Sequence, residues 1–393
     1  MNIMLGRLAR GGSLAKRESP PTVSLAVWDL PTRLYHWLQA VLVTAALLTG
    51  YFAPKSWFSF HVWLGYAIGG LILFRLVWGF FGSEHSRFAS FIFPPRRVVE
   101  HVRGLIVGPH KHSIGHNPLG SLMVFAMIAV IAGVLATGLI ALGGQENQGA
   151  LAGFVNFNFG TLARHAHSAG AALLIAMIVA HLAGVLVESL IERRSLVTAM
   201  ITGRKQLPDD LAAAGPLPRL PRWGLAAISL VTAGGAIIVA GAFASRVPPS
   251  GIIAMPELAA YKTECGACHE PYHPSLLPRA SWSVLMANLS DHFGEDASLD
   301  PATTKAIADW LDRYASEAWD TKAANWLRDV DPADPTRITA TRFWQWRHHR
   351  IPKAIFESPE VGAPSNCAAC HRDATTGRFD AQMINVPEAA EGE

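Results

Sequence analysis

The four cysteines are the residues whose spacing points most directly to chemistry. They form two Cys-x-x-Cys-His motifs, and the residues are Cys265, Cys268 and His269, and Cys367, Cys370 and His371. In this motif the thiols bond covalently to the vinyl groups of a porphyrin, and the histidine becomes the proximal ligand of its iron. Because the motif occurs twice and no cysteine is left over, the sequence predicts two covalently bound c-type hemes.

Two other roles of paired cysteines fit this spacing less well. A zinc ribbon places its two pairs about 15–20 residues apart, whereas about a hundred residues separate these pairs. A redox-active dithiol would not need a histidine after the second cysteine in both copies. The thiols are therefore expected to be alkylated by heme and not to form disulfides.

Composition divides the chain into an apolar part and a polar part. Half of the 393 residues are hydrophobic, 16% are charged and the mean hydropathy is +0.24, while soluble domains carry about 25% charged residues. Residues 34–243 account for the deficit, and residues 256–393 resemble an ordinary polar domain. The basic residues are not interleaved with aromatic residues on one face, so no nucleic-acid partner is predicted.

Five stretches are long and apolar enough to cross a bilayer, which takes about 20 residues per helix. They are residues 33–52, 61–82, 118–142, 166–188 and 223–244. The first lacks a small-residue cleavage site at its end and other spans follow it. It is therefore predicted to be a retained helix and not a signal peptide.

Basic residues in the loops predict the orientation. Sixteen lie in the N-terminal arm and in the loops after the second and fourth spans: Arg7, Arg10, Lys16, Arg17, Arg33, Arg87, Arg96, Arg97, Arg103, Lys111, Arg193, Arg194, Arg204, Lys205, Arg219 and Arg222. The intervening loops contain only Lys55 and Arg164. The N-terminus is therefore expected in the cytoplasm, and the C-terminal domain outside it.

Histidines in the apolar spans could bind two further hemes. They are His36, His61, His167 and His181. The last two are fourteen residues apart, close to four helical turns, so they share one face about 21 Å apart and could each ligate a different heme. Depth pairs His61 with His167, and His36 with His181. Each could instead be a hydrogen-bonded interhelical residue, but unpartnered imidazoles are costly in a membrane and two matched pairs favour heme.

Other polar residues of this part leave alternatives open. His165 is an alternative outer ligand to His167, although the fourteen-residue spacing favours His167. Arg75 in the second span could pair with a heme propionate or extend toward the interface. The remaining histidines of the loop that follows are expected to be solvated: His85, His101, His110, His112 and His116.

Several segments resemble the bacterial cytochrome b561 family, which is related to the b-type cytochrome subunit of nickel–iron hydrogenases. The resemblance spans about residues 22–206 and is carried by VWDLPTRLYHWLQA, HVWLGYAIGGLILFRLVWGFFG, GHNPLGSLMVFAMIAV and HAHSAGAALLIAMIVAHLAG. Members are four-helix bundles with two b-type hemes, which implies the same for the four histidines above. The fifth span contains no histidine and is expected to be a tether.

The sixth ligands of the two c-type hemes have several candidates: His273, His292, His348, His349, Met255, Met286 and Met383. Residues 255–388 are similar to the dihaem cytochrome c family, through MPELAAYKTECGACH, LLPRASWSVLMANLSDHFGEDASLD, RITATRFWQWRHHRIP and SNCAACHRDATTGRF. This resemblance implies His292 and His348 as the distal ligands. A helix-end role for His292 and an exposed role for His348 are the alternatives. The doubled histidine leaves His349 as a substitute, and His273 could hydrogen-bond a propionate.

The rest of the polar domain is expected to be short helices and loops. Asp300 should cap a helix that has Pro301 at its first position. Six tryptophans suit a small core built against porphyrin rings, although an electron relay is an alternative: Trp282, Trp310, Trp319, Trp326, Trp344 and Trp346.

The expected architecture is all-α. It comprises a transmembrane four-helix bundle with two b-type hemes, a fifth tethering transmembrane helix, and a small mainly helical domain with two c-type hemes. The expected divisions are a cytoplasmic arm (1–32), the b561-like domain (33–206), a cytoplasmic linker (207–222), the tether (223–244) and a periplasmic domain (255–393).

Four six-coordinate hemes favour an electron carrier over an enzyme that converts a substrate, because no iron keeps an open site. The expected function is electron transfer from the quinone pool, in the lipid bilayer of the bacterial inner membrane, to a soluble periplasmic redox protein. The reverse direction fits the same arrangement. If the protein is an enzyme, a quinol:cytochrome oxidoreductase is expected.

Two other functions remain as alternatives. One is a superoxide:quinone-type oxidoreductase, which would need a positively charged outer entrance where the outer loops offer only Lys55 and Arg164. The other is a heme-bearing membrane anchor for a separate catalytic protein such as a hydrogenase.

Overall fold

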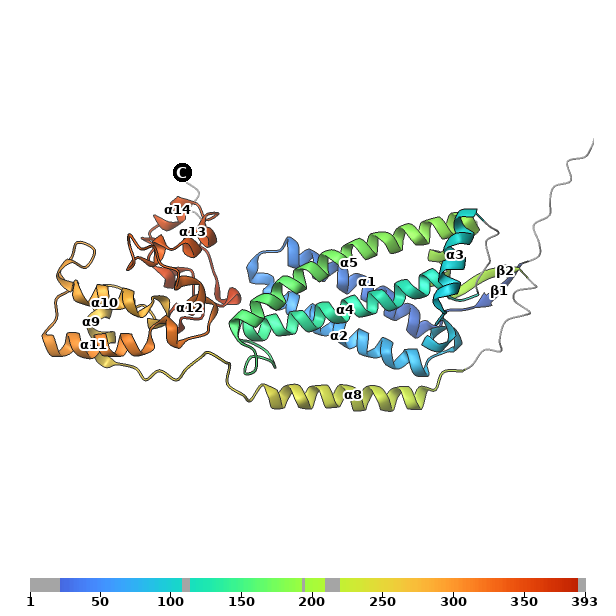
Figure 1. The fold of residues 1–393 in the computed structure, drawn as a ribbon, viewed down its shortest axis with the longest axis horizontal. Helices are drawn as coiled ribbons and strands as arrows, with labels where there is room; N and C mark the ends of the chain where they lie inside the picture. Colours follow the sequence, from blue (N-terminus) through green and yellow to red (C-terminus); the bar gives the residue numbers. More distant parts are fainter. Residues whose placement is uncertain (1–21, 108–113, 193–194, 209–219, 388–393) are drawn as a thin grey trace, which may run out of the picture.

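The structure is a computed structural model that describes residues 22–107, 114–192, 195–208 and 220–387. An elongated helical bundle is followed by a smaller helical domain at one of its ends (Figure 1). The helices of the first part are α1 (Leu30–Tyr51), α2 (Phe58–Phe81), α3 (Pro95–Val107), α4 (Pro118–Gly144), α5 (Phe157–Glu192), α6 (Leu196–Thr202) and α8 (Trp223–Ala244). The second part contains α9 (Ala259–Glu264), α10 (Arg279–Ala287), α11 (Pro301–Tyr314), α12 (Lys322–Leu327), α13 (Arg342–His348) and α14 (Lys353–Phe356).

Some of the predicted basic residues and loop histidines lie outside the described residues. They are Arg7, Arg10, Lys16, Arg17, His110, Lys111, His112, Arg193, Arg194 and Arg219.

Four helices of the described part are long and apolar enough to cross a membrane. They comprise α4, α8, most of α5, and α2 together with the preceding turn η1 (Lys55–Trp57). The first predicted span also forms a helix, the 22-residue α1, but Tyr35, His36 and Gln39 contribute to making it less apolar than the others. The apolar-span prediction is therefore confirmed for four segments, and α1 takes part in the bundle through its packing.

The bundle core joins one face from each of α1, α2, α4 and α5. Its buried centre consists of Val43, Ile68, Ile72, Ile131 and Leu174. The last two of these helices approach very closely where α4 ends and α5 begins, and a Cβ added to Gly144 would lie 2.8 Å from the Cα of Gly160. Small residues allow such close contact between membrane helices. The core therefore packs together the three helices that carry the predicted histidines, α1, α2 and α5.

Helix α8 contacts the bundle mainly through its first turns. The ring of Trp223 lies 4.7 Å from that of Trp78, and Ala226 is buried against the same end of α2. Further along, Val231, Ile238 and Phe243 are 70–75% exposed, as expected for side chains that face lipid. The tethering role of α8 remains a prediction.

A small sheet and an extra helix lie at the end of the bundle opposite the second domain (Figure 1). Strands β1 (Thr22–Ala26) and β2 (Arg204–Pro208) pair antiparallel, with Thr22 opposite Pro208. Helix α3 occupies the loop after the second span. The mostly helical fold is confirmed. The small sheet and α3 were not predicted. Pairing of β1 with β2, about 180 residues apart in the sequence, depends on how the whole chain folds.

The second domain has its own hydrophobic core around α10 and α11. Leu277, Trp282, Ile307 and Leu311 are each at most 4% exposed and pack in one cluster. The predicted cap of α11 is confirmed, since the carboxylate of Asp300 accepts hydrogen bonds from the main-chain N–H groups at its first turn.

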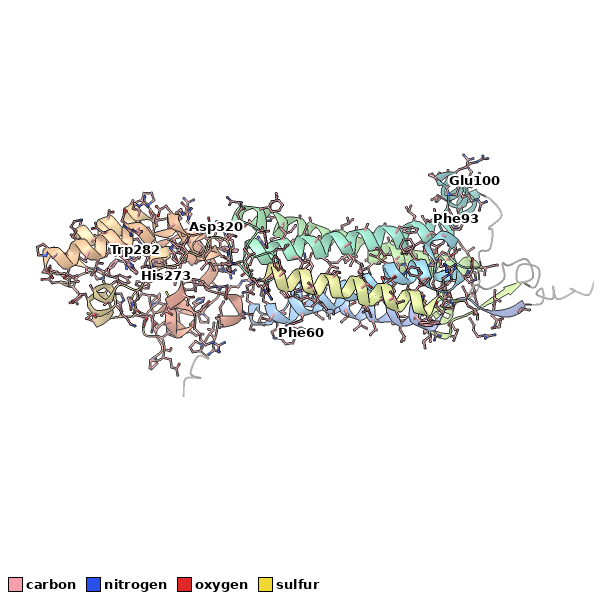
Figure 2. The ribbon with its side chains drawn as sticks, turned by 90° about the horizontal axis from the view of Figure 1, so that it is seen from below. Phe60, Phe93, Glu100, His273, Trp282 and Asp320 are labelled. Carbon is pink, nitrogen blue, oxygen red and sulfur yellow. The ribbon has the colours of Figure 1, made fainter. Side chains whose placement is uncertain are left out.

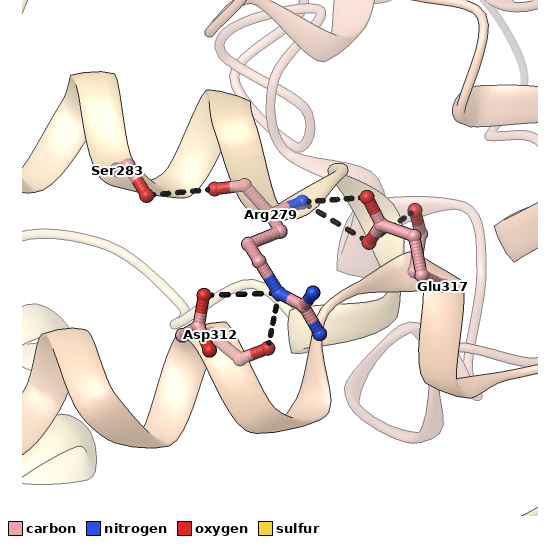
Figure 3. A network of polar contacts seen from close by, with 5 residues as sticks. Arg279, Ser283, Asp312 and Glu317 are labelled. Carbon is pink, nitrogen blue, oxygen red and sulfur yellow. Dashed lines mark hydrogen bonds and ion pairs between the residues drawn. The ribbon is translucent and has the colours of Figure 1, made fainter.

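A polar network fixes the start of α10 against α11 (Figure 3). The main-chain N–H of Arg279 donates to both carboxylate oxygens of Glu317. The Nε of Arg279 donates to the main-chain oxygen of Asp312 and also pairs with the Asp312 carboxylate. The Ser283 hydroxyl donates to the Arg279 carbonyl within α10. The side chains of Arg279 and Asp312 are about half exposed, so their ion pair contributes little to stability.

His273 links this core to the C-terminal segment. It is 6% exposed, its Nδ1 is 2.8 Å from the Ser275 hydroxyl, and its ring packs on Trp319. A Cβ added to Gly377, where φ is +66°, would lie 2.4 Å from that Nδ1. His273 is therefore a packed core residue here, and burial lowers its pKa to about 4.

Replacing Gly377 with alanine is expected to destabilise the second domain by about 2–5 kcal/mol. Left-handed backbone strain costs about 1–2 kcal/mol and overpacking about 1–3 kcal/mol. Gly362 is the matched control, because its φ is +75° but a Cβ there would meet nothing within 4 Å. Thermal unfolding should show a lower Tm for Gly377→Ala than for Gly362→Ala. Equal shifts would mean that contact with His273 is unimportant.

Candidate functional site

The structure brings the eight predicted histidine ligands together as four pairs. The ring centroids are 6.4 Å apart for His36 and His181, 6.1 Å for His61 and His167, 6.3 Å for His269 and His292, and 6.2 Å for His348 and His371. An imidazole nitrogen lies about 2 Å from a bound metal ion and about 1 Å from its ring centre, so two axial imidazoles on one iron have centres about 6 Å apart. All four pairs fit that geometry.

The pair His61 and His167 is oriented by hydrogen bonds that involve its Nδ1 atoms. His61 on α2 has Nδ1 3.0 Å from the hydroxyl of Thr49, and His167 on α5 has Nδ1 2.9 Å from the carbonyl oxygen of Val134. A histidine ligand commonly uses one ring nitrogen in this way, which fixes the ring and leaves the other for metal. Nε2 is thus the available ligand atom on each ring.

Two glycines make room for these rings. A Cβ added to Gly50 on α1 would lie 3.3 Å from the Cε1 atom of His61, and one added to Gly138 on α4 would lie 3.1 Å from the ring of His167. The local sequence gives no signal for this role, because the contacts join residues on different helices.

The second pair lies toward the other end of the bundle. His36 on α1 faces His181 on α5, and Trp37 lies edge-on to His36 at 5.1 Å. Among the described residues, no hydrogen-bond partner reaches the buried Nδ1 of His36. His165, the alternative to His167, is exposed and is not part of a ring pair in the described chain.

Arg75, near the C-terminal end of α2, differs partly from expectation. Arg75 is only 3% exposed, donates to the Ser86 carbonyl and lies 4.7 Å from the ring centre of Phe88. It therefore does not extend into solvent, and its pairing with a propionate remains a prediction.

The prediction that His116 is a solvated loop residue is wrong. Its ring lies 4.6 Å from that of Trp28 and 4.4 Å from that of Phe91. Burial, together with the nearby Arg75 charge, lowers the pKa of His116 to about 3. His85 is half-buried and burial lowers its pKa too.

The first Cys-x-x-Cys-His motif follows α9, and Cys265–Ala267 form a short 3-10 turn. His269 is exposed and its Nδ1 is 2.9 Å from the Glu270 carbonyl oxygen. Its partner His292 precedes Phe293 and Gly294, which have φ values of +57° and +97°. Positive φ at a phenylalanine is strained, and such strain often marks a functional turn. Here the turn holds the His292 ring 16° from parallel to that of His269.

The second motif forms the corresponding 3-10 turn, Cys367–Ala369. Its partner His348 ends α13, stacks on Trp344 at 4.4 Å, and has Nδ1 2.8 Å from the Trp344 carbonyl oxygen. The neighbouring His349 is exposed, and its Nδ1 lies 2.7 Å from the carbonyl oxygen of Trp346. The structure therefore brings His348, and not His349, to His371.

Replacing His348 with alanine is expected to remove the sixth ligand from one of the two c-type hemes. His349→Ala is the matched control and should leave the c-type absorption spectrum unchanged, because its ring points elsewhere. The spectrum of the oxidised protein should change from six- to five-coordinate for one heme in the first variant only. The opposite pattern would assign the ligand to His349.

The four cysteines, all within the described residues, form no disulfide. Burial raises the pKa of Cys265 and of Cys367 to about 11, which opposes the low thiolate pKa of a redox-active dithiol. Within the described residues, no group of three or more His, Cys, Asp or Glu side chains could hold a metal ion. Thioether attachment of heme is the chemistry that fits the two motifs.

A cavity of about 380 Å³ lies between the two motifs. Residues of both motifs line it, including Cys268, His269 and Cys367, together with Tyr272 and Phe379. The hydroxyl of Tyr272 donates to the Ser365 carbonyl across this region. The two predicted c-type sites are thus neighbours that share one opening.

Two of the methionines that were candidates for a sixth heme ligand make other contacts in the structure. Met286 is 7% exposed in the α10–α11 core, and the main-chain carbonyl of Met383 accepts a hydrogen bond from the main-chain N–H of Arg372.

Trp282 and Trp319 are buried, whereas Trp346 is 62% exposed. None of these positions argues for an electron relay through tryptophan.

Comparisons with known proteins match two separate parts of the chain, which correspond to the helical bundle and to the second domain. Residues 27–203 match the family described as prokaryotic cytochrome b561, and residues 261–379 match the family described as dihaem cytochrome c. A probable Ni/Fe-hydrogenase B-type cytochrome subunit of Azotobacter vinelandii is 30% identical, over 47% of this chain and 89% of the relative. The Escherichia coli K12 protein named as a probable Ni/Fe-hydrogenase 1 B-type cytochrome subunit is 25% identical, over 48% and 93%.

Solved structures resemble the C-terminal domain in sequence. A diheme c-type cytochrome from Shewanella baltica is 36% identical, covering 34% of this chain and 95% of that chain, with a TM-score of 0.28. A diheme cytochrome c from Rhodobacter sphaeroides is 36% identical, covering 32% and 100%, also with a TM-score of 0.28.

Proposed function

This chain belongs to the prokaryotic cytochrome b561 family and carries a dihaem cytochrome c domain, and on this basis we propose that it transfers electrons between the quinone pool and a periplasmic redox protein. It is a multi-pass protein of the bacterial inner membrane that binds b-type heme and c-type hemes. The observation that supports the proposal best is the series of four histidine pairs that continues from the bundle into the second domain. Within each pair the two ring centres are 6.1–6.4 Å apart.

We assign the ligands as follows. His36 with His181 and His61 with His167 would hold two b-type hemes, and His269 with His292 and His348 with His371 would hold two c-type hemes bound to Cys265, Cys268, Cys367 and Cys370. A heme iron with two histidine ligands exchanges single electrons and has no free position for a substrate. The chain's own residues orient two of these pairs: Thr49 and the Val134 carbonyl contact His61 and His167 in the bundle, and the Trp344 carbonyl contacts His348 in the second domain.

The proposed orientation has the N-terminus in the cytoplasm and the second domain in the periplasm. Basic side chains of the described residues, such as Arg96, Arg204 and Lys205, belong to α3 and β2. Those elements lie at the end of the bundle opposite the second domain (Figure 1). Positive loops favour the cytoplasmic side.

A second function has one supporting observation. The named relatives are probable hydrogenase subunits, so the bundle could anchor a hydrogenase and exchange electrons with it. A catalytic polypeptide that co-purifies and is needed for heme reduction would favour this anchor function.

Membrane vesicles that contain the protein should pass electrons from added quinol to an added soluble c-type cytochrome. Vesicles with His181→Ala protein should lose this activity, because one site of the series is missing. If transfer requires hydrogen and a co-purified hydrogenase, and quinol alone gives none, the electron-carrier proposal fails and the anchor function is favoured.

A further inference from the structure

The second domain meets the outer end of the bundle through a junction centred on Asp320, which Figure 2 labels where the two parts adjoin. The Asp320 carboxylate accepts a hydrogen bond of 2.8 Å from the main-chain N–H of Phe157, the first residue of α5. A carboxylate at this position interacts favourably with the positive N-terminal end of the α5 dipole. The same carboxylate accepts from the side-chain amide of Asn325 on α12.

The connecting segment after α8 is part of this junction. The main-chain N–H of Asp320 donates to the Gly251 carbonyl, and a Cβ on Gly251, where φ is +76°, would lie 2.2 Å from that of Asp320. Ser250 donates its hydroxyl to the Val155 carbonyl and accepts at its carbonyl from Asn147. The linker is therefore fixed to both parts.

An ion pair closes the junction. Lys322 at the start of α12 contacts Glu146 in the turn after α4, and their side chains are only 13% and 14% exposed. Removing one partner of a buried pair leaves an uncompensated charge and is strongly unfavourable. For comparison, Lys305 and Asp309 on α11 form a pair that is 76% and 66% exposed.

A second contact connects the two histidine sites nearest the junction. The hydroxyl of Ser59, two residues before His61, donates to the side-chain oxygen of Gln382 over 2.6 Å. Gln382 lies in η11 (Ala381–Met383), which contacts η1 and α2. The next residues return to the second motif, because Arg372 N–H donates to the Met383 carbonyl and His371 forms a β-bridge with Ile384.

The first motif lies away from this contact. It follows α9, and its partner His292 follows α10. Figure 1 shows α9, α10 and α11 at the free end of the second domain, with α12 closer to the bundle than they are. His269 and Cys268 are exposed there.

We propose that this junction fixes the order of the sites, so that the His348–His371 site exchanges electrons with the His61–His167 site and the His269–His292 site is the terminal one that meets the external partner. The inference depends on the proposed electron-transfer function. One electron passes at the junction. The His61–His167 site is oxidised and the His348–His371 site is reduced, with no bond made or broken and no proton moved.

The position of the junction is tested first by cross-linking in the full chain. Ser59→Cys with Gln382→Cys should give a cross-linked peptide with a short thiol reagent, detected by mass spectrometry. Ser59→Cys with Glu270→Cys, beside the first motif, should give none. Cross-linking of the second pair alone would reverse the proposed order.

The role of the ion pair is tested by charge reversal. Lys322→Glu and Glu146→Lys should each slow electron transfer from b- to c-type hemes by about tenfold or more, since small misplacements have large effects on rate. Combining the two should restore the rate to within about threefold. Reversal of the exposed pair, Lys305→Glu with Asp309→Lys, should leave it unchanged. Equal rates in all variants would overturn the proposal.

These experiments separate the two proposals. If quinol fails to reduce the parent protein, the proposed function fails, while the cross-linking result still decides the geometry of the junction. If quinol reduces all hemes but the junction variants behave as the parent, only the proposed order fails.

Discussion

Replacing His181 with alanine should remove one b-type heme and leave the other b-type heme and both c-type hemes bound. The ring centres of His181 and His36 are 6.4 Å apart, and among the described residues neither ring pairs with another histidine. Loss of one imidazole therefore leaves a single ligand in an apolar bundle. The second b-type site is about 21 Å further along α5. It has its own hydrogen bonds, between the Thr49 hydroxyl and His61 and from His167 to the Val134 carbonyl, and should be unaffected.

Heme extraction and the b-to-c ratio measure this directly. The parent should contain two b-type hemes for two c-type hemes, and the variant one for two. His165→Ala is the matched control on the same helix, because His165 is exposed, and it should retain all four. Retention of both b-type hemes in His181→Ala would show that the ligand pairing is wrong.

The second large effect is expected from removing one covalent attachment site at a time. Cys367→Ala with Cys370→Ala should halve the covalently bound heme and slow reduction of the remaining c-type heme by about tenfold or more, because the site beside the bundle is lost. Main-chain hydrogen bonds from Asn385 to Cys370 and from Arg372 to Met383 place this motif at η11.

The matched variant carries Cys265→Ala with Cys268→Ala. It should also lose one covalent heme, seen as a mass change of one heme in the denatured chain. Its remaining c-type heme should still be reduced as in the parent, although delivery to an external cytochrome should fall. If the two variants exchange these behaviours, the first motif is the one that receives electrons from the bundle.

Local patterns in the sequence predicted the parts that depend on local chemistry. The apolar runs predicted α2, α4, α5 and α8, and the Cys-x-x-Cys-His motifs predicted both covalent sites, because each signal is contained in a short segment. The fourteen-residue interval on α5 predicted which histidines share a face, and the structure brings His36 and His61 to them.

Features that depend on contacts between distant segments were not predicted. Gly50 and Gly138 provide space for histidine rings on other helices, and nothing in their own surroundings indicates this. Asp320 reads as an ordinary surface residue until α5 is placed beside it. His116 was misassigned because its loop is polar in sequence, whereas Trp28 and Phe91 enclose it in the fold.

The most direct test of the central claim is anaerobic addition of quinol to the purified, fully oxidised protein, with the b- and c-type absorption bands followed separately in time. We expect the b-type band to change first and the c-type band to follow. If neither band changes while dithionite reduces all four hemes, or if the c-type band changes first, electrons do not enter from quinol through the bundle and the account is contradicted.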